Sequence, residues 1–473
     1  MAAPAESPAR QEEDPGPGLV DWRTALDVGA RLVDAAEDGL LADAVRQAQD
    51  RMPAFRNRAY PLSPLPLFVH AEAATCVARQ LEPYVRLLSK VARLYLDDAG
   101  VRRWYGLPPA ADLLIAAEAH GDGPERTEIG VCRLDGYLEQ DSGRLRILEN
   151  NADAPAGTLF TPRIHAVVRS VLDTAGITVP PHALRAAPRD DALLDAVRPA
   201  LTAARREGRT PVLAVLQPDG AANRESVLMA GAFQAQGIDA FVADPREVTP
   251  AGGRARVGRR TLDACWNKVN TVGWQRLVQD DPGLVARWAR ILRETDLRHV
   301  NSFLARYVAE SKLTLALVQE PAFATLFEED ERRLAALLLP WSRRAEPAGG
   351  LPEQLMARQH EYVLKEPYDI RGDGVTIGRA VSREAWAEAV GRAVKEGGVA
   401  QRYVPPAAYP VVRTDTDPRV VAMPVSFDTY VIRGTVAFHG SKASLQPRVN
   451  IFQGGQKLSV HVTTDSTGGE GLR

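Results

Sequence analysis

The sequence predicts a mixed α/β protein with a helical N-terminal region, and three patterns carry this prediction. Apolar residues recur near a 3.6-residue period over much of the first 100 residues. Strand-like and helix-like segments alternate between residues 209 and 270, which is typical of a small parallel sheet. In the last third, short runs rich in Val, Ile and Leu surround a glycine-bearing loop and predict strands.

The first part of the chain is expected to begin with helices and to continue with strands. Apolar spacing indicates a helix over residues 21–52 and another around residues 85–96. The proline-rich segment Pro61-Leu-Ser-Pro-Leu-Pro66 separates these two helices. Three short apolar runs then predict strands at Leu113–Ile115, Ile129–Val131 and Leu145–Leu148.

The remaining elements follow the same two periodicities. The central part predicts strands at 211–216 and 238–242, a helix at 224–236, one or two strands within 257–266, an amphipathic helix at 284–298 and helical structure over 301–343. The last third predicts strands at 362–364, 399–404, 420–423, 429–432 and 458–463, with a helix at 383–395.

Composition excludes several classes of protein. The 473 residues include 58 Lys and Arg against 60 Asp and Glu, so a net charge of −2 gives no general attraction to nucleic acid or to an anionic membrane. Cys76, Cys132 and Cys265 lie far apart, which argues against a disulfide framework or a structural zinc site. No apolar run reaches the roughly 18–20 residues that span a bilayer, and the first residues lack the apolar core of a signal peptide. We therefore expect a cytoplasmic protein with neither nucleic-acid nor membrane partners.

Residues 362–378 present a lysine on a predicted strand, followed by a glycine-bearing loop that returns into a second strand. The lysine is Lys365, and the loop contains Gly372, Asp373 and Gly374. Glycine lets backbone N–H groups approach phosphate oxygens closely, and a lysine supplies a positive charge. The pattern favours a phosphate-binding loop, and the alternative is a simple hairpin turn. It is neither a Walker A loop nor a Rossmann fingerprint.

Two later segments are candidates for contacting a nucleotide base and a metal ion. The stretch Gln401-Arg402-Tyr403-Val404 ends a predicted strand whose backbone groups can contact the edge of an adenine, unless it is a plain edge strand. Asp428 and Asn450 lie on candidate strands and offer the oxygen ligands that Mg²⁺ prefers. Either of these two residues is otherwise a routine turn former.

Polar side chains crowd the end of the predicted strand at 145–148. The crowded residues are Glu149, Asn150, Asn151 and Asp153, with Arg133 and Asp135 on the preceding strand. Functional loops commonly occupy such positions, although a capped turn before the helix near Thr161 is the alternative.

Two further lysines are candidate site residues. Lys312 precedes an apolar helical segment, where a lysine is normally a solvated surface residue. Lys268 follows a predicted strand at its carboxyl end, which is the usual ligand side of open α/β sheets.

Taken in order, these features resemble those of the circularly permuted ATP-grasp proteins, the group related to glutathionylspermidine synthase and to carboxylate–amine ligases. The resemblance covers roughly residues 110 to 462. It is carried by the blocks Glu149–Gly157, Asn301–Lys312, Lys365–Gly378 and Gln401–Val404, and by Asp428, Lys442, Asn450 and Gly454-Gly455.

The resemblance implies an ATP-dependent ligase that uses Mg²⁺ to phosphorylate a small carboxylate, which an amine then attacks. It places Lys312 and Lys365 on the phosphates, the loop from Arg371 to Gly374 over them, adenine at Gln401–Val404 and Mg²⁺ at Asp428 and Asn450. Arg133 and Lys442 would steady the acyl phosphate or the carboxylate, with Lys268 as a third candidate catalytic residue. The candidate substrate-binding residues are Asp135, Glu149, Asn150, Asn151 and Asp153.

The expected organisation follows from this likeness. It comprises a disordered leader (1–20), a helical and permuted ATP-grasp segment (21–208), a small parallel pre-ATP-grasp-like layer (209–300), a nucleotide-binding region (301–463) and a flexible tail (464–473). The fold class is thus α/β of the permuted ATP-grasp kind.

The glycine loop departs from the family pattern, which leaves other functions open. Glu366 stands at a usual proline, Arg371 at a usual glycine and Asp373 at a usual basic residue. A carboxylate beside a triphosphate repels it unless Mg²⁺ or Arg371 bridges the two. The alternatives are therefore a non-catalytic nucleotide- or metabolite-binding protein, and a kinase that stops at the acyl phosphate. Neither the acid, the amine nor the oligomeric state follows from the sequence.

Overall fold

The computed structural model describes residues 18–49, 51, 54–55, 58–59, 61–120, 128–183, 189, 191–220, 224–369, 372–413, 419–447, 449 and 455–464. Three residues of the expected site, Arg371, Asn450 and Gly454, lie outside the described residues. So do most of the expected leader and all but the first residue of the expected tail.

Fourteen α-helices are present in this part of the chain. They are α1 (Trp22–Glu37), α2 (Leu40–Gln49), α3 (Ala71–Asp97), α4 (Ala99–Tyr105), α5 (Pro109–Ala119), α6 (Phe160–Thr174), α7 (Ala192–Arg206), α8 (Arg224–Gln234), α9 (Thr271–Asp280), α10 (Leu284–Glu294), α11 (Leu313–Leu317), α12 (Glu329–Leu338), α13 (Leu351–Ala357) and α14 (Arg383–Glu396).

The strands of the described residues form six sheets. They are β1 (Ala54–Phe55), β2 (Arg58–Ala59), β3 (Leu67–His70), β4 (Val131–Leu138), β5 (Leu145–Asn151), β6 (Val212–Leu216), β7 (Asp239–Ala243), β8 (Val248–Ala251), β9 (Arg254–Val257), β10 (Arg260–Thr261), β11 (Ala264–Asn267), β12 (Arg298–Val300), β13 (Ser342–Arg344), β14 (Tyr362–Lys365), β15 (Val375–Ile377), β16 (Val399–Arg402), β17 (Ala408–Arg413), β18 (Arg419–Pro424), β19 (Ser426–Ile432), β20 (Thr435–Ala443) and β21 (Gln456–Thr463).

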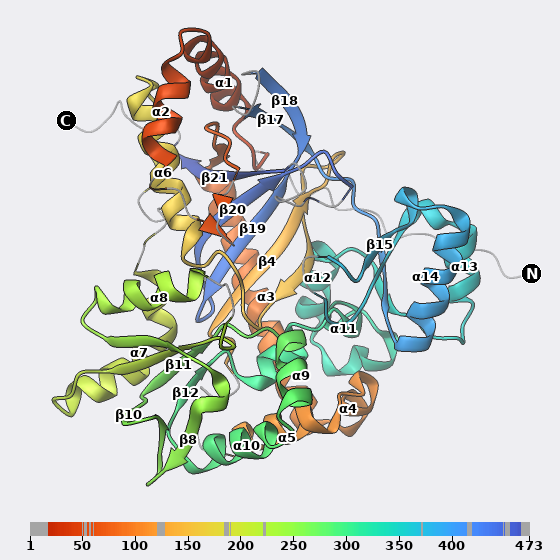
Figure 1. Ribbon diagram of the computed structural model, residues 1–473. Coiled ribbons are helices and arrows are strands. Elements are labelled where there is room, and N and C mark those ends of the chain that lie inside the picture. The colour runs from red at the N-terminus through yellow and green to blue at the C-terminus, as the bar shows by residue number, and fades with distance from the viewer. Residues whose placement is uncertain are drawn as a thin grey trace, which may run out of the picture.

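The largest sheet joins strands from both ends of the sequence. Its order is β3-β21-β20-β19-β4-β5, so β4 lies directly beside β19, a strand that follows it by almost 300 residues, and β5 forms the edge beyond β4 (Figure 1). All its pairs are antiparallel except that of β21 with β3. The long helix α3 covers one face, where Tyr84 bonds to Asn150, and α6 covers part of the other face, where Thr161 lies against Gly440. A sheet that joins strands from both ends of the sequence is the arrangement expected when the order of segments is circularly permuted.

Two smaller sheets flank the large one. The sheet β12-β11-β6-β7 is wholly parallel, which confirms the predicted parallel α/β layer. The antiparallel sheet β13-β16-β14-β15 packs against α13 and α14 around its own small core, which includes Leu355, Leu364 and Trp386. This sheet and its two helices project to the right in Figure 1. The predicted domain boundaries stay a prediction, because one continuous core spans the remaining elements.

Two predictions of local structure are wrong. Leu113–Ile115 lies inside helix α5 and is not a strand. A three-residue apolar run does not distinguish the two states, and here flanking alanines and Pro109 in the first turn favour a helix. The stretch 301–343 is not continuously helical: a π-helical turn, α11, a 3₁₀ turn and α12 follow one another before β13.

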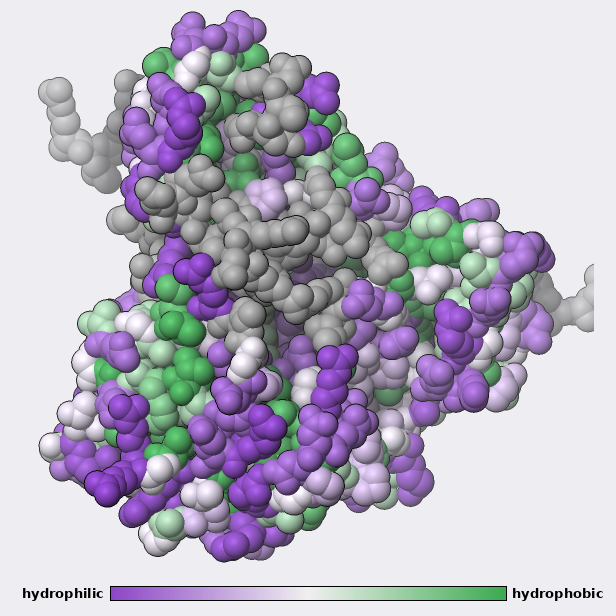
Figure 2. Space-filling model, viewed as in Figure 1, coloured by the Kyte–Doolittle hydropathy of each residue, from purple (hydrophilic) through white to green (hydrophobic). Residues whose placement is uncertain are grey.

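Hydrophilic residues cover most of the described surface on the face shown in Figure 2, with smaller hydrophobic groups between them. Within the described residues, no helix combines the length and the apolar character that crossing a membrane requires.

Candidate functional site

The candidate site is built on one face of the six-stranded sheet. Asp135 on β4 lies opposite Glu149 on β5 and Asp428 on β19. Arg133, two residues earlier on β4, lies opposite Asn151. Because side chains alternate between the faces of a strand, this register brings all five polar side chains to the same face.

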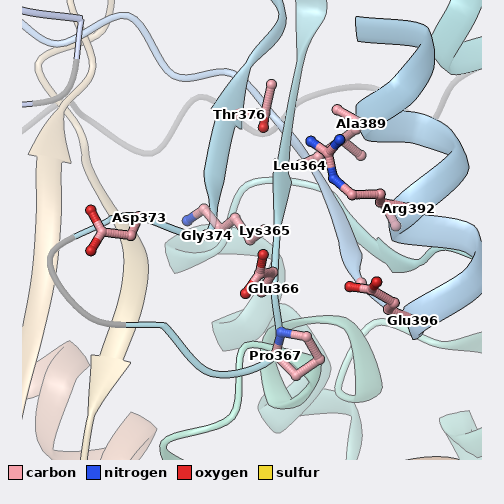
Figure 3. Close-up of a pocket in the computed structure, with 12 residues that line it drawn as sticks. Leu364, Lys365, Glu366, Pro367, Asp373, Gly374, Thr376, Ala389, Arg392 and Glu396 are labelled. Carbon is pink, nitrogen blue, oxygen red and sulfur yellow. The ribbon is translucent and has the colours of Figure 1, made fainter. Parts of the chain in front are cut away.

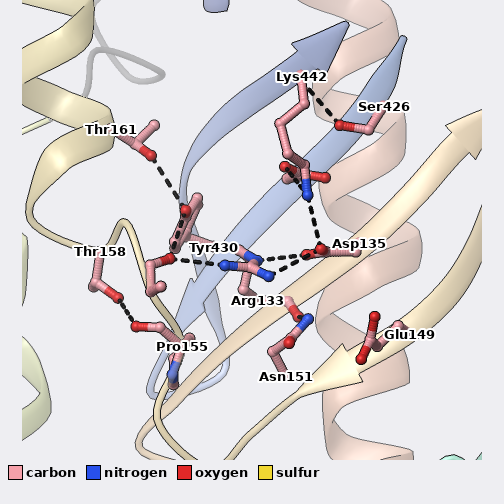
Figure 4. A network of polar contacts seen from close by, with 12 residues as sticks. Arg133, Asp135, Glu149, Asn151, Pro155, Thr158, Thr161, Ser426, Tyr430 and Lys442 are labelled. Carbon is pink, nitrogen blue, oxygen red and sulfur yellow. Dashed lines mark hydrogen bonds and ion pairs between the residues drawn. The ribbon is translucent and has the colours of Figure 1, made fainter. Parts of the chain in front are cut away.

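Arg133, Asp135 and Lys442 form a closely connected network on this face (Figure 4). Arg133 donates to both carboxylate oxygens of Asp135, at 2.5 and 2.9 Å. Lys442 Nζ on β20 lies 3.0 Å from Asp135 Oδ2 and 3.1 Å from Asp428 Oδ2. Burial raises the pKa of Asp135, but the two cations outweigh burial and hold it well below its usual range. Asp135 is therefore an anion at neutral pH.

Asp428 occupies a different environment from Asp135 although the two carboxylates are paired in register. Its side chain is 1% exposed, and Oδ1 has no hydrogen-bond partner among the described residues. Burial and the neighbouring Asp135 raise the pKa of Asp428, and Lys442 and Lys457 only partly oppose them. Asp428 is buried and has two lysine amines within 4.0 Å, so it is less accessible to a metal ion than an exposed carboxylate.

Lys457 on β21 completes an excess of positive charge at this face. Its Nζ lies 4.0 Å from Asp428 Oδ2. Burial lowers the pKa of Lys457, Asp428 opposes this only in part and Lys442 adds to the lowering, so the pKa falls to about 8. Around Asp135 and Asp428, the three cations Arg133, Lys442 and Lys457 outnumber the two carboxylates, so this part of the face is suited to a further anion.

Two lysines from separate elements converge on the end of β5. Lys312, before α11, has its Nζ 2.9 Å from Glu149 Oε1 and also pairs with Asp369. Lys365, the last residue of β14, donates to the carbonyl of Leu148 at 2.7 Å. The two lysines thus face a common region between the large sheet and the β14 sheet, as the phosphate hypothesis requires.

Their surroundings give these lysines different pKa values. Burial lowers the pKa of Lys312, but Glu149 and Asp369 outweigh it and raise the value above the ordinary range. Burial also lowers the pKa of Lys365, to about 8, because Glu149 and Asp369 offset burial only in part and Lys312 repels a second cation. Lys365 consequently titrates close to neutral pH.

The glycine loop borders a pocket beside β14 (Figure 3). Lys365, Asp373 and Gly374 line it together with residues of α14, including Arg392, while the amine of Lys365 points away from α14 towards β4 and β5. A Cβ on Gly374 would lie 2.9 Å from side-chain atoms of Glu366, so the loop can close only with glycine there. Asp373 is exposed on this loop.

The predicted adenine-contacting strand lies inside its sheet. β16 pairs with β13 on one side and with β14 on the other, so it is not an edge strand. Gln401 is buried and donates to Ser342 Oγ at 3.1 Å, whereas Arg402 is exposed. The Tyr403 N–H bonds to the carbonyl of Glu361, and the buried Val404 follows. Adenine contact at Gln401–Val404 stays a prediction.

The loop after β5, residues 152–157, is fastened from several elements. The carboxylate of Glu310 accepts the N–H groups of Ala152 and Asp153. Asp153 in turn accepts the N–H of Thr271 at 2.9 Å, and Arg133 donates to the carbonyl of Ala156 at 2.8 Å. These hydrogen bonds fix the loop backbone, and the Asp153 side chain takes part by accepting the bond from Thr271.

Two residues expected in the site have structural roles instead. Asn150 is 1% exposed and lies on the opposite face from Glu149 and Asn151, where it accepts a hydrogen bond from Tyr84. The expectation of substrate contact fails because neighbouring side chains of a strand point to opposite faces. Lys268 follows β11 as expected, but its Nζ is buried between Glu225, at 3.1 Å, and the carbonyl of Pro155. In this structure it bonds to the loop, and its catalytic role stays a prediction.

The sequence interpretation overlooked Lys457 and Glu310. The alternation in Lys457-Leu-Ser-Val-His-Val462 already indicated a strand with one polar face, so Lys457 was recognisable as a residue of that face. Nothing local marks Glu310, because its function depends on a loop about 150 residues away.

Comparisons with known proteins give the fold its class. No family model and no curated protein matches the sequence. A glutathione synthetase-like effector from Globodera pallida, in its apo form, matches with a TM-score of 0.57 and 12% identity, over 93% of this chain and 96% of that one. The chain thus has an α/β fold of the ATP-grasp class. It is similar in fold to this glutathione synthetase-like effector, which agrees with the resemblance stated from the sequence.

Two further solved structures are more distant. One is a putative gamma-glutamylcysteine synthetase from Methylobacillus flagellatus, with 12% identity, a TM-score of 0.39 and coverage of 80% of this chain and 87% of that one. The other is a RimK domain ATP-grasp protein from Sphaerobacter thermophilus, with 16% identity, a TM-score of 0.26 and coverage of 50% and 91%. TM-scores below 0.5 do not establish a common fold.

Proposed function

We propose that the protein is an ATP-dependent ligase that joins a small carboxylate to an amine through an acyl phosphate. The observation that carries this proposal is the convergence of Lys312 and Lys365 on the end of β5, between two sheets of an ATP-grasp fold. Phosphoryl transfer depends mainly on positioning and on neutralising charge, and fixed lysines supply both. The proposal extends to a cytoplasmic enzyme acting on small molecules.

In this proposal the nucleotide lies between the β14 sheet and the large sheet. Lys312 and Lys365 bind its phosphates, the loop from Arg371 to Gly374 covers them and Gln401–Val404 holds the adenine. The close packing of Gly374 against Glu366 supports a tight loop at this position.

The residues present fit a Mg²⁺ ion. Glu149 and Asn151 lie two residues apart on β5, so a carboxylate and an amide oxygen share a face. Glu149 is 29% exposed, in contrast to the buried Asp428. We therefore place the metal at Glu149 and Asn151, while the role of Asp428 with Asn450 stays a prediction. The bound ion would neutralise phosphate charge.

The cations of the large sheet provide for the second substrate. Arg133, Lys442 and Lys457 carry more positive charge than Asp135 and Asp428 offset, and all five side chains are largely buried. A substrate carboxylate, and the phosphate that forms on it, would restore the balance. These residues bind and orient the acid, and a small amine then attacks the acyl phosphate.

An ADP-release assay tests the proposal. The purified full-length protein with Mg²⁺ and ATP is screened against small carboxylic and amino acids in pairs with amines. We expect release that needs both partners, and Lys365→Ala to reduce it by about 100-fold or more. Lys395→Ala, which alters an exposed lysine of α14, is the matched control and should leave the rate unchanged. Full activity of Lys365→Ala would contradict the nucleotide site.

The exposed carboxylate of Asp373 favours a second candidate, a protein that binds a nucleotide without turning it over. Asp373 borders the same pocket as Lys365, where it repels a polyphosphate. Titration calorimetry with Mg·ATP, followed by the ADP assay, separates the two candidates. Binding without turnover for every substrate pair supports this alternative, and tighter binding by Asp373→Lys would show that the repulsion operates. Acyl hydroxamate formed with hydroxylamine, but no amine-dependent product, would indicate a kinase.

A further inference from the structure

Three histidines from separate segments meet on the face of the large sheet that α6 covers. His165 lies on α6, His461 on β21, and His182 in the segment that pairs with the end of β21. One ring nitrogen from each lies within 4.8 Å of the others. The rings of His182 and His461 are 4.6 Å apart between centroids, and those of His165 and His182 are 4.9 Å apart.

The hydrogen bonds of two rings leave the same nitrogen available on each. His461 Nε2 lies 2.9 Å from the carbonyl of Pro180, so this nitrogen carries the proton and Nδ1 carries the lone pair. His165 is bonded to the backbone of Val460, and its Nδ1 has no hydrogen-bond partner in the described part of the chain. His461 Nδ1 also has no partner among the described residues. A ring that donates one N–H to a carbonyl and presents its other nitrogen is the usual arrangement of a metal-bound histidine.

The environment keeps these rings neutral and able to donate a lone pair. Burial, together with His182 and His461, lowers the pKa of His165 to about 3. Burial and His182 also lower the pKa of His461, to about 4. Arg169 is the other charged group that acts on both rings, and it too disfavours their protonation.

We propose that His165, His182 and His461 form a binding site for a borderline transition-metal ion of the zinc type, separate from the ligase site. Imidazole nitrogens suit Zn²⁺, Co²⁺ and Ni²⁺, whereas Mg²⁺ prefers oxygen ligands. His461 lies four residues beyond Lys457, about 13 Å along the strand, so the ligand sets do not overlap.

Binding requires a small local adjustment. Zinc–nitrogen bonds of about 2.0–2.1 Å place tetrahedral ligands about 3.4 Å apart, so the three nitrogens must close in from their present spacing. His182 Nδ1 accepts the N–H of Val462 at 3.1 Å, and ligation by His182 exchanges this hydrogen bond for the metal bond. The ion would then fasten α6, the segment around His182 and β21 to one another.

Zinc titration of the full-length protein tests the site. The protein is stripped with a chelator and titrated with Zn²⁺ against a chromophoric zinc indicator, with excess Mg²⁺ present to occupy the carboxylates. We expect one equivalent to bind and the melting temperature to rise, because an ion that binds only the folded state stabilises it. Failure to bind one equivalent overturns the proposal.

Histidine-to-glutamine variants locate the ligands. His165→Gln, His182→Gln and His461→Gln should each weaken binding by at least about 10-fold, the scale on which loss of even an outer-shell partner acts. His360→Gln, at an exposed histidine, should bind as the wild type does. Wild-type affinity in any of the three variants overturns the three-ligand site. ¹⁵N NMR of the histidine rings gives a second readout that does not depend on the variants folding: the Nδ1 signals of His165 and His461 must shift with Zn²⁺.

Discussion

A single buried amine, Lys365, shows how competing effects set the chemistry of one residue. Its removal from water favours the neutral form, while Glu149 favours the charged form and Lys312 opposes it. The result is a lysine whose pKa is about 8, so its charge changes in the range in which enzymes are assayed.

Nucleotide affinity should therefore depend on pH in a defined direction. Lys365 is charged below its pKa and neutral above it, so we expect Mg·ATP binding to weaken as pH rises through about 8. Titration calorimetry between about pH 7 and pH 9, roughly one unit either side of this value, measures the effect. Lys365→Arg should abolish the alkaline loss because arginine stays charged. Lys457→Arg should retain the loss, and its disappearance there would assign the titration to Lys457.

The metal ligands can be distinguished by the Mg²⁺ requirement. Asn151→Ala removes an amide oxygen from the proposed site and should raise the Mg²⁺ concentration for half-maximal ADP release by about 10-fold or more. Asn151→Asp retains an oxygen ligand and should restore the wild-type value. An unchanged requirement in Asn151→Ala, together with a raised one in Asn450→Ala, would favour the pair Asp428 and Asn450.

At the scale of an element, hydrogen bonds from several other elements hold the loop of residues 152–157 in place. Gly157 ends it with φ = +81°, and an added Cβ would lie 2.6 Å from the hydroxyl oxygen of Tyr430. Gly143, in the turn between β4 and β5, has φ = +66° but open space around it. Both glycines have a positive φ, but only at Gly157 would an added Cβ meet a neighbouring side chain.

This difference predicts unequal costs for the same substitution. Gly143→Ala should lose about 1 kcal/mol of unfolding free energy through backbone strain alone. Gly157→Ala should lose more, because Tyr430 must also move and it bonds to Thr161 and Ala156. Urea denaturation of both variants measures the costs, and equal losses would show that the loop tolerates the displacement.

The buried pair of Lys268 and Glu225 should matter for stability more than for chemistry. The side chains are 2% and 3% exposed, and each also bonds to the loop, at Pro155 and Gly157. Lys268→Met removes a cation that lies 3.1 Å from the buried carboxylate of Glu225 and should cost about 3–5 kcal/mol. The double variant Lys268→Met/Glu225→Gln should recover part of that loss. A destabilised Lys268→Met enzyme that retains its kcat when folded would confirm a positioning role.

At the scale of the whole molecule, the sequence predicted the classes of element better than their partners. The parallel layer and most strands of the last third followed from hydrophobic period. Alternation along β5 could also have separated Glu149 and Asn151 from Asn150, but a crowded polar run was interpreted as one surface. The pairing of β4 with β19 depends on contacts across almost 300 residues, and local pattern carries no record of it.

Interior histidines predict acid sensitivity of the whole fold. Burial lowers the pKa values of His439 and His461 to about 4, while the unfolded chain binds protons at about 6.5. Between these values the unfolded state holds more protons, so stability falls as pH falls, by up to about 1.4 kcal/mol per pH unit for each histidine. In zinc-free buffer, His439→Gln should make this dependence shallower by about that amount in urea melts at pH 5 to 6.5. His360→Gln should leave the slope unchanged.

The placement of β21 between β3 and β20 also bears on synthesis at the ribosome. Until residues 456–463 emerge, β3 has no partner in the sheet and Lys457 is missing from the polar face. Nascent fragments that stop short of this strand would expose open β edges, which are prone to self-association. β21 must therefore be translated before the large sheet can assemble, so products that stop before residue 456 should be inert and readily recognised by quality-control proteases.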